Sequence, residues 1–188
     1  MSAPLPFATP QDWRNWLAAH HATETEVTLR LYKKASGIPS ITWEEAVIEA
    51  LAFGWIDGVK RPGGADHWLQ RFTPRKPRSV WSQKNRAHAE RLIAEGRMAP
   101  AGLAQVEAAK SDGRWDAAYA GGKDAEVPQD FLDALAQNPK AAAAYETLNA
   151  KNRFAIYYRL TSAKRPETRA KRIADFVAML ERGERFRP

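Results

Sequence analysis

Apolar residues recur along the chain with two periods, and the first of these predicts a small sheet. In residues 27–33, aliphatic side chains alternate with polar ones, which is the pattern of a strand with one buried face. Residues 55–61 and 67–73 read as two further strands, and the Pro-Gly-Gly sequence at residues 62–64 predicts a turn between them. We therefore predict a small antiparallel β-sheet of about three strands in the N-terminal half of the chain.

The second period is helical and fills most of the remaining sequence. Thr9 and Thr42 are placed to cap two helices in the N-terminal half, and Ser79 is placed to cap a third that runs to Glu95. Further helix starts are marked by Pro100, Pro128, Pro139 and Pro166. The last helix carries an apolar stripe at Ile173, Phe176, Val177 and Leu180. The predicted fold class is therefore α+β, mainly helical, with a helical C-terminal half.

The 188 residues are enough for one domain, or for a domain with a small appendage. We expect an α+β part at residues 1–96 and a helical part at residues 97–188, and a single continuous domain also fits the pattern. The Gly-rich, acidic residues 119–127 are the best linker candidate, and Gly96 marks a softer boundary.

Composition excludes several classes of protein. The chain contains no Cys, which removes disulfide scaffolds, zinc–cysteine sites and cysteine nucleophiles. No apolar run approaches the roughly 20 residues that span a bilayer, so we expect no membrane insertion. The N-terminal residues lack a basic stretch followed by an apolar core, so they do not resemble a secretory signal. We expect a cytoplasmic protein.

The net charge of +7 is unevenly distributed. Residues 60–97 hold 10 Lys or Arg against three acidic residues, and residues 151–188 hold 11 against four. Such segregation suggests a positive face that attracts an anionic partner, either a small molecule or a nucleic acid. Solvated helix faces that are basic for solubility remain the alternative.

No phosphate-binding glycine loop and no nucleophile elbow is present, and the four His show no metal-ligand spacing. We therefore expect no cofactor and no metal, and the sequence identifies no catalytic residue. The enzyme question stays open and leans toward a non-enzymatic protein.

The strongest candidate site is a basic and aromatic segment that runs into a helix start. Two prolines hold it extended, and the helix N-terminus supplies unpaired N–H groups that suit an anion. The candidate ligand-binding residues are Trp55, Asp57, Arg75, Lys76, Arg78, Ser79, Trp81, Ser82 and Asn85. Two structural alternatives stay open: Asp57 forms a salt bridge with Arg75 or Arg78, or guanidinium groups stacked on Trp side chains hold the loop.

A second basic cluster lies at a helix–Pro–helix junction, where another helix N-terminus meets several cations. Its members are Lys164, Arg165, Arg169 and Arg172. The alternative is a solvated connection capped by Glu167.

Several segments also carry a family resemblance: residues 40–46, 49–58, 72–76, 79–85, 92–98, 102, 109–115 and 163–173. The Gly-Trp-Ile-Asp sequence at residues 54–57 and the Ser-Val-Trp-Ser-x-x-Asn sequence at residues 79–85 are the most distinctive. On these segments the chain resembles the bacteriocin-protection proteins of the YdeI/OmpD-associated family. The resemblance implies protection against bacteriocins or cationic antimicrobial peptides and association with an outer-membrane porin, and it implies no reaction. The basic charge and the missing export signal do not favour direct porin contact or capture of cationic peptides.

Three functions follow as hypotheses. The first is a non-enzymatic, stress-resistance type of protein that binds an anionic ligand at the candidate site. The second is nucleic-acid binding through both basic segments, with an affinity that falls steeply with salt. The third is an enzyme acting on a small phosphorylated or carboxylated substrate, with Asp57 as acid or base, which predicts a deep pocket and a shifted pKa of Asp57.

Overall fold

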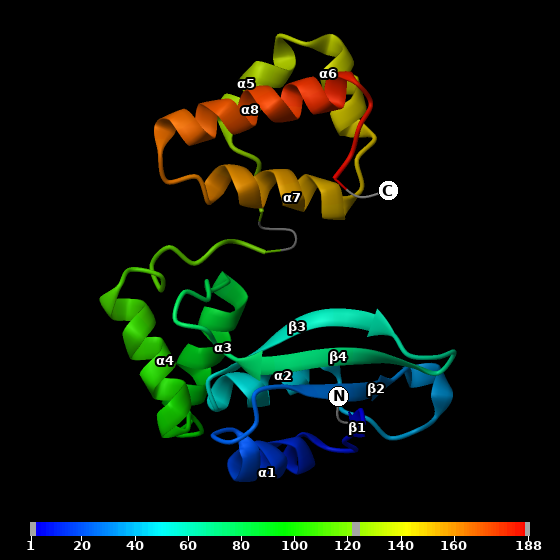
Figure 1. Cartoon of the computed structure of the whole chain (residues 1–188), viewed down its shortest axis with the longest axis vertical. Coiled ribbons are helices and arrows are strands. Elements are labelled where there is room, and N and C mark those ends of the chain that lie inside the picture. Colours follow the sequence, from blue (N-terminus) through cyan, green and yellow to red (C-terminus); the bar gives the residue numbers. More distant parts are fainter. Residues whose placement is uncertain (1–2, 122–124, 187–188) are drawn as a thin grey trace. The chain divides into compact units, whose positions relative to one another are not determined.

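The computed structural model describes residues 3–121 and 125–186, and the chain divides into two compact units, Met1–Ala118 and Tyr119–Pro188. Each unit has its own hydrophobic core and is described by itself (Figure 1).

The N-terminal unit consists of four strands and four α-helices among its described residues. In chain order these are β1 (Leu5–Pro6), α1 (Pro10–His20), β2 (Val27–Tyr32), the 3-10 turn η1 (Lys34–Ser36), α2 (Trp43–Ala52), β3 (Trp55–Pro62), β4 (His67–Pro74), α3 (Gln83–Ala94) and α4 (Pro100–Ser111). The strands form one sheet with the order β1-β2-β4-β3.

The predicted antiparallel arrangement of three strands is confirmed, because β2 pairs antiparallel with β4 and β4 pairs antiparallel with β3. The structure adds β1, which pairs parallel with β2 and makes the sheet mixed. Two residues, one of them a proline, are too few to show an alternating pattern, so the sequence did not predict this strand. A register shift between Asp57 and Lys60 marks a bulge in β3.

One face of the sheet carries the core of the N-terminal unit. Val27, Leu29 and Leu31 are buried in one hydrophobic cluster with Trp13 of α1 and with the apolar side of α2. The indole nitrogen of Trp13 donates a hydrogen bond of 3.0 Å to the carbonyl of Ala46, which ties α1 to α2. Figure 1 shows α3 and α4 beside one end of this sheet.

The helix caps follow the sequence at two of three predicted positions. Thr9 and Thr42 each form a capping box. The carboxylate of Asp12 accepts from the backbone N–H of Thr9, and that of Glu45 accepts from the backbone N–H of Thr42. The prediction that Ser79 caps α3 is wrong, because Ser82 occupies that position and its hydroxyl accepts from the backbone N–H of Asn85 at 3.1 Å.

The division between the units falls at the beginning of the linker candidate 119–127, of which residues 122–124 lie outside the described residues. We had expected residues 97–118 to group with the helical part. They pack in the N-terminal unit, because Val106, Ala109 and Trp115 are buried in the same core as the sheet.

The C-terminal unit is helical among its described residues, as predicted. Its helices are α5 (Gln129–Ala136), α6 (Pro139–Glu146), α7 (Ala150–Thr161) and α8 (Pro166–Glu181). Phe176 and Leu180 of the predicted stripe on α8 are buried against Phe131 of α5 and Ile156 of α7. Within residues 3–121 and 125–186, none of the helices combines the length and the apolar character needed to cross a bilayer.

Candidate functional site

The basic-aromatic segment joins β4 to α3, and two of its residues belong to the core. Arg75 is 5% exposed and Trp81 is 1% exposed. The guanidinium of Arg75 lies 3.8 Å from the ring centre of Trp81, and its Nη2 donates to the carbonyl of Val80 at 2.7 Å. Trp81 also packs edge to face on Trp115, with the ring centres 4.9 Å apart. This is the stacking that the sequence offered as a structural alternative, realised for Arg75 on Trp81.

The buried Arg75 holds a tight turn at residues 76–79, which we call the basic turn. Within it, the backbone N–H of Lys76 donates to the hydroxyl of Ser79 at 2.9 Å, and the N–H of Ser79 donates to the carbonyl of Lys76 at 2.9 Å. The side chain of Arg114 donates to the carbonyl of Ser79 at 2.9 Å. These three hydrogen bonds and a fourth, of 3.4 Å from Nη2 of Arg75 to the carbonyl of Ser79, fix the path of this turn.

Lys76 and Arg78 extend from the basic turn into solvent. Both are exposed, and neither forms an ion pair with any residue that the structure describes. Two acidic residues of the same unit form salt bridges with other cations: Asp112 with Arg114 at 2.7 Å, and Glu44 with Lys84 at 2.8 Å. Two cations on a fixed turn therefore remain available to an anion.

The start of α3 contributes less than the sequence suggested. The hydroxyl of Ser82 accepts from the N–H of Asn85, so part of the helix N-terminus is already capped from within the chain. Ser79, Ser82 and Asn85 are half-buried. Of the nine predicted ligand-binding residues, Lys76 and Arg78 are the exposed ones.

Trp55 and Asp57 lie at the beginning of β3. Trp55 is buried, and its indole nitrogen donates to the carbonyl of His21 at 3.2 Å. Asp57 is half-buried, and its Oδ2 accepts from the indole nitrogen of Trp43 at 3.2 Å. Among the described residues, the Asp57 carboxylate forms no salt bridge, so its direct partner is an indole rather than an arginine.

Burial raises the pKa of Asp57 above its ordinary value of 3.8. The hydrogen bond from Trp43 and the positive charge of Arg75 act in the opposite direction and do not cancel the effect of burial. The carboxylate is thus placed where its charged form is disfavoured.

We expect Asp57→Asn to raise the free energy of unfolding near neutral pH. Because the pKa of Asp57 is raised in the folded state, the folded protein binds this proton more tightly than the unfolded chain does. The ionised carboxylate therefore costs stability above the raised pKa. That cost fades as the pH falls through the window between the raised value and 3.8, and the variant's advantage fades with it. The asparagine oxygen still accepts from Trp43.

Urea unfolding of the wild type and the variant, from about pH 3 to about pH 7, measures this difference. Asp116→Asn, at an exposed position, is the matched control and should follow the wild type. A less stable Asp57→Asn variant at neutral pH would contradict the expectation.

The sequence missed a cluster of titratable groups beside Asp57. Trp43 and Glu44 open α2, and Lys84 and His88 of α3 face them. The hydrogen bond and charge of Lys84 lower the pKa of Glu44, while burial and the neighbouring cations Lys84 and Arg91 lower the pKa of His88. The spacing of 40 residues between Glu44 and Lys84 gave no signal for this contact. In the described part of the chain, no three His, Asp or Glu side chains are arranged to hold a metal ion.

The sequence also missed a buried ion cluster. Glu49 of α2 is 4% exposed, and its carboxylate accepts from Arg14 at 2.8 Å and from Arg97. Arg14 also donates to the carbonyl of Arg97 at 2.7 Å. These contacts join α1, α2 and the segment before α4, so the cluster has a structural role.

In the second basic cluster, two residues form contacts within the C-terminal unit and two are exposed. Arg169 forms a bidentate pair with Asp130, at 2.6 and 2.8 Å, which links α8 to α5. Arg172 donates to the carbonyl of Arg159 near the end of α7. Lys164 and Arg165 are exposed and adjacent to the start of α8. Of the four cations, Lys164 and Arg165 are thus the two that form neither an ion pair nor a side-chain hydrogen bond within the part of the chain that the structure describes.

Comparisons with known proteins divide the chain in the same way as its fold. The family described as Bacteriocin-protection, YdeI or OmpD-Associated matches residues 124–183, in the C-terminal unit, which confirms the predicted resemblance there. A second family, described as Domain of unknown function (DUF8412), matches residues 5–105. Most of the segments quoted for the resemblance lie in this second match, and residues 163–173 lie in the first.

No curated protein and no solved structure is significantly similar to the chain. The two family matches together cover most of both units, and the longer one spans more than half of the 188 residues. The chain therefore belongs to the family of the domain of unknown function DUF8412, and its residues 124–183 are similar to the family described as Bacteriocin-protection, YdeI or OmpD-Associated.

Proposed function

We propose that the protein is a non-enzymatic, bacteriocin-protection type of protein whose N-terminal unit binds an anionic ligand at the basic turn. The match of residues 124–183 supports the protection class. The observation that carries the ligand is a pair of exposed cations, Lys76 and Arg78, which form no ion pair with a described residue and lie on a turn fixed by Arg75 and Arg114.

A fixed turn favours binding because its backbone loses little conformational freedom when a ligand arrives. Arg78 can hold a phosphate or carboxylate through two parallel hydrogen bonds, and Lys76 adds a compact positive charge. The buried Arg75 acts through the turn rather than on the ligand, because its side chain is 5% exposed and its Nη2 donates to the carbonyls of Ser79 and Val80.

We expect Lys76→Ala with Arg78→Ala to weaken binding of inorganic pyrophosphate at least about tenfold, because one lost charge-assisted hydrogen bond costs roughly 1.5 kcal/mol or more. Isothermal titration calorimetry at low salt measures the affinity. The matched control is Lys34→Ala with Arg61→Ala, which removes two exposed cations of the same unit. Equal losses in both variants would attribute binding to net charge and overturn the basic turn as the site.

A second candidate, nucleic-acid binding, is favoured by the outer face of the sheet. Since Val27, Leu29 and Leu31 point into the core, Thr28, Arg30 and Tyr32 point to the opposite face. The strand register adds Arg61, His67 and Arg71 to this face. Cations interleaved with an aromatic ring suit a single-stranded backbone and its bases. The two basic segments of the sequence lie in different units, so the N-terminal one carries this candidate.

Fluorescence anisotropy with labelled single-stranded DNA separates the two candidates. If the outer face binds, Arg30→Ala with Arg61→Ala reduces the slope of log affinity against log salt by about 1.4, while the basic-turn variant leaves the slope unchanged. If the basic turn binds only small anions, DNA binding is weak in the wild type and unaffected by either variant.

A further inference from the structure

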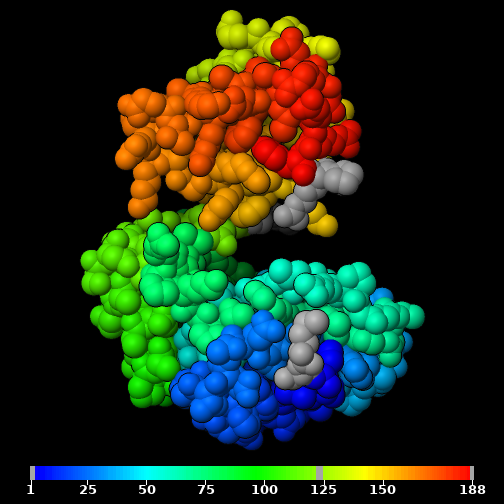
Figure 2. Space-filling view, viewed as in Figure 1, coloured from blue at the N-terminus to red at the C-terminus, as the bar shows by residue number. Residues whose placement is uncertain are grey.

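An exposed aromatic ring and a half-buried carboxylate lie together in the N-terminal unit, and the proposed function uses neither. Trp43 opens α2 and is 40% exposed, while its indole nitrogen donates to Asp57 of β3. The carboxylate of Asp57 forms no salt bridge with a described residue, so its oxygens can accept further hydrogen bonds from a ligand. β3 is an edge strand of the sheet, and β3 and β4 reach the surface of the unit (turquoise in Figure 2).

Arg75 connects this carboxylate to the basic turn. Its Nη2 donates to the carbonyls of Ser79 and Val80, and its positive charge also acts on Asp57. The backbone N–H of Arg75 donates to the carbonyl of Gly54 at 2.9 Å. Asp57 follows Gly54 by three residues of extended chain, which is roughly 10 Å. One small ligand can therefore contact both the basic turn and the carboxylate.

Asp57 also lies on the same side of the sheet as the stack of Arg75 on Trp81. Trp55 and Asp57 are two residues apart in β3 and share a face, and Trp55 is buried in the same core as Trp81. Trp81 was a predicted ligand-binding residue, but it is 1% exposed. Trp43 is exposed, so it replaces Trp81 as the ring on which a ligand can stack.

The charges around the exposed ring admit an anionic ligand. Glu44 forms a salt bridge of 2.8 Å with Lys84, which balances its negative charge. The ammonium of Lys84 lies 5.7 Å from the ring centre of Trp43, and its side chain is 53% exposed. The charge of Arg75 acts in the same way on Asp57. Each of these two carboxylates is thus accompanied by a cation, which reduces its repulsion of an anion.

We infer that the anionic ligand of the basic turn is a nucleotide. Its phosphate groups bind Lys76 and Arg78, its ribose hydroxyls donate to Asp57, and its base stacks on Trp43. We rest this assignment on the proposed function, because the basic turn supplies the phosphate contacts. The cations, the carboxylate and the aromatic ring match the three chemical parts of a nucleotide, whereas an inorganic anion would use the cations alone.

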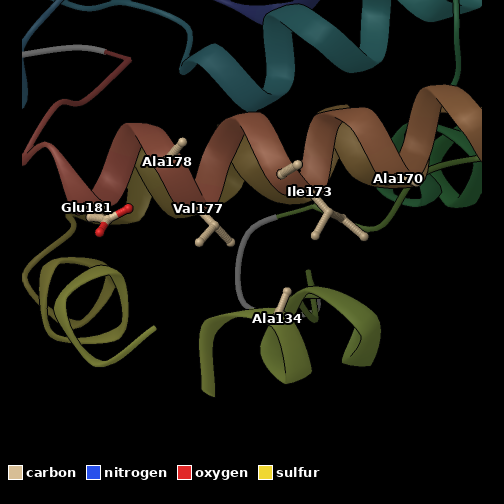
Figure 3. Close-up of a pocket in the computed structure, with 7 residues that line it drawn as sticks. Ala134, Ala170, Ile173, Val177, Ala178 and Glu181 are labelled. Atoms are coloured by element: carbon tan, nitrogen blue, oxygen red, sulfur yellow. The ribbon is translucent and has the colours of Figure 1, made fainter. Parts of the chain in front are cut away.

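A hollow in the C-terminal unit lacks this combination of groups. It lies between α5 and α8, has a volume of about 470 Å³, and is lined by residues that include Ala134, Ile173, Val177 and Glu181 (Figure 3). Among the described residues that line it, none is a cation and none is aromatic. Apolar walls with one carboxylate do not suit a phosphorylated ligand, so we assign the nucleotide to the N-terminal unit.

Isothermal titration calorimetry of the full-length protein with three probes measures what each part of the ligand contributes. The probes are pyrophosphate, ADP and dideoxy-ADP, which lacks both ribose hydroxyls. We expect ADP to bind at least about tenfold more tightly than pyrophosphate, because it adds base stacking and hydrogen bonds to a carboxylate. Dideoxy-ADP should bind about tenfold more weakly than ADP, because it cannot donate to Asp57.

Two variants address the ring and the carboxylate. Trp43→Leu should weaken ADP binding at least about fivefold and leave pyrophosphate binding unchanged, and Trp43→Phe should restore part of the loss. Asp57→Asn should reduce the preference for ADP over dideoxy-ADP. Leu103→Ala, which truncates another exposed apolar side chain of the same unit, is the matched control and should bind like the wild type. Circular dichroism confirms that each variant is folded.

The outcomes separate the nucleotide from the proposed anion site. If pyrophosphate binds through Lys76 and Arg78 but ADP binds no more tightly, the nucleotide is wrong and the anion site stands. If ADP binds equally well without these two cations, the phosphates are not on the basic turn and both are wrong. Equal losses in Trp43→Leu and Leu103→Ala would overturn the stacking. A short RNA with a 5′-phosphate that binds more tightly than ADP, with the same dependence on Trp43, would assign the site to nucleic acid and overturn a free nucleotide.

Discussion

Gly102→Ala should destabilise the N-terminal unit by about 2 to 3 kcal/mol, the upper range for overpacking a well-filled site. A Cβ atom at position 102 would lie 2.3 Å from the carbonyl oxygen of Ala52 and 2.6 Å from the sulfur of Met98. Ala52 ends α2, and its carbonyl also accepts from the N–H of Ala99 at 3.0 Å. The backbone of α2 cannot yield without breaking this contact, so α4 must move away.

The predicted change in stability of Gly102→Ala is opposite in sign to the change expected from helix propensity alone. Position 102 lies in the first turn of α4, where replacing Gly by Ala gains up to about 1 kcal/mol from helix propensity. A loss of stability can therefore come only from the close approach of α4 to α2. Urea unfolding followed by Trp fluorescence is the measurement, because all seven Trp residues precede residue 119 and report the N-terminal unit.

Gly58→Ala is the control for Gly102→Ala, because position 58 is exposed in the same unit and the atom nearest to a Cβ there is the Nε of Arg71, at the ordinary contact distance of 3.4 Å. Its stability should stay within about 0.5 kcal/mol of the wild type. If Gly102→Ala proved as stable as the wild type or more stable, the packing of α4 on α2 described above would be wrong.

Arg14→Ala with Arg97→Ala should cost about 3 kcal/mol, the lower end of the range measured when one side of a buried ion pair is removed, because Glu49 is buried while the two arginines are partly exposed. The carboxylate of Glu49 is buried and accepts hydrogen bonds from both arginines. Without them it stays inside the unit as a charge that neither water nor a cation compensates. The same Trp fluorescence transition in urea reports the loss.

Adding Glu49→Gln to this double variant separates buried charge from lost packing. The amide has nearly the same shape and no charge, so the triple variant should recover part of the lost stability. The matched control is Lys84→Ala, which removes a salt bridge from Glu44 on the same helix, with both side chains about half exposed. That control should cost less than about 1 kcal/mol. A triple variant less stable than the double variant would argue against an uncompensated charge as the cause.

Local patterns predicted the elements of this fold well. The alternation at residues 27–33 corresponds to β2, and the hydroxyl–acid spacings at Thr9 and Thr42 correspond to two capping boxes. The cap of α3 was the exception, although Ser79 and Ser82 both precede the helical pattern. Arg75 binds the carbonyl of residue 80 and Arg114, 35 residues further along the chain, binds the carbonyl of residue 79; together these contacts hold residue 79 in a turn outside the helix.

The candidate site was predicted in its position and only partly in its chemistry. The sequence located the basic residues between β4 and α3, but it could not distinguish Arg75, which is buried on Trp81, from Arg78, which is exposed. That distinction depends on Trp115, which packs on Trp81 from 34 residues away. The partner of Asp57 was likewise Trp43 rather than a neighbouring arginine.

The amino-acid sequence by itself determined the α+β class, the segregation of positive charge and the resemblance of the C-terminal segment, because these depend on spacing, composition and short motifs. Only the tertiary structure determined which charged side chains form ion pairs with described residues and which are exposed without one. Glu49 and Arg169 are satisfied by partners far away in the chain, whereas Lys76 and Arg78 are left to solvent. Burial and pairing arise from contacts between distant segments, and no local pattern of residues encodes them.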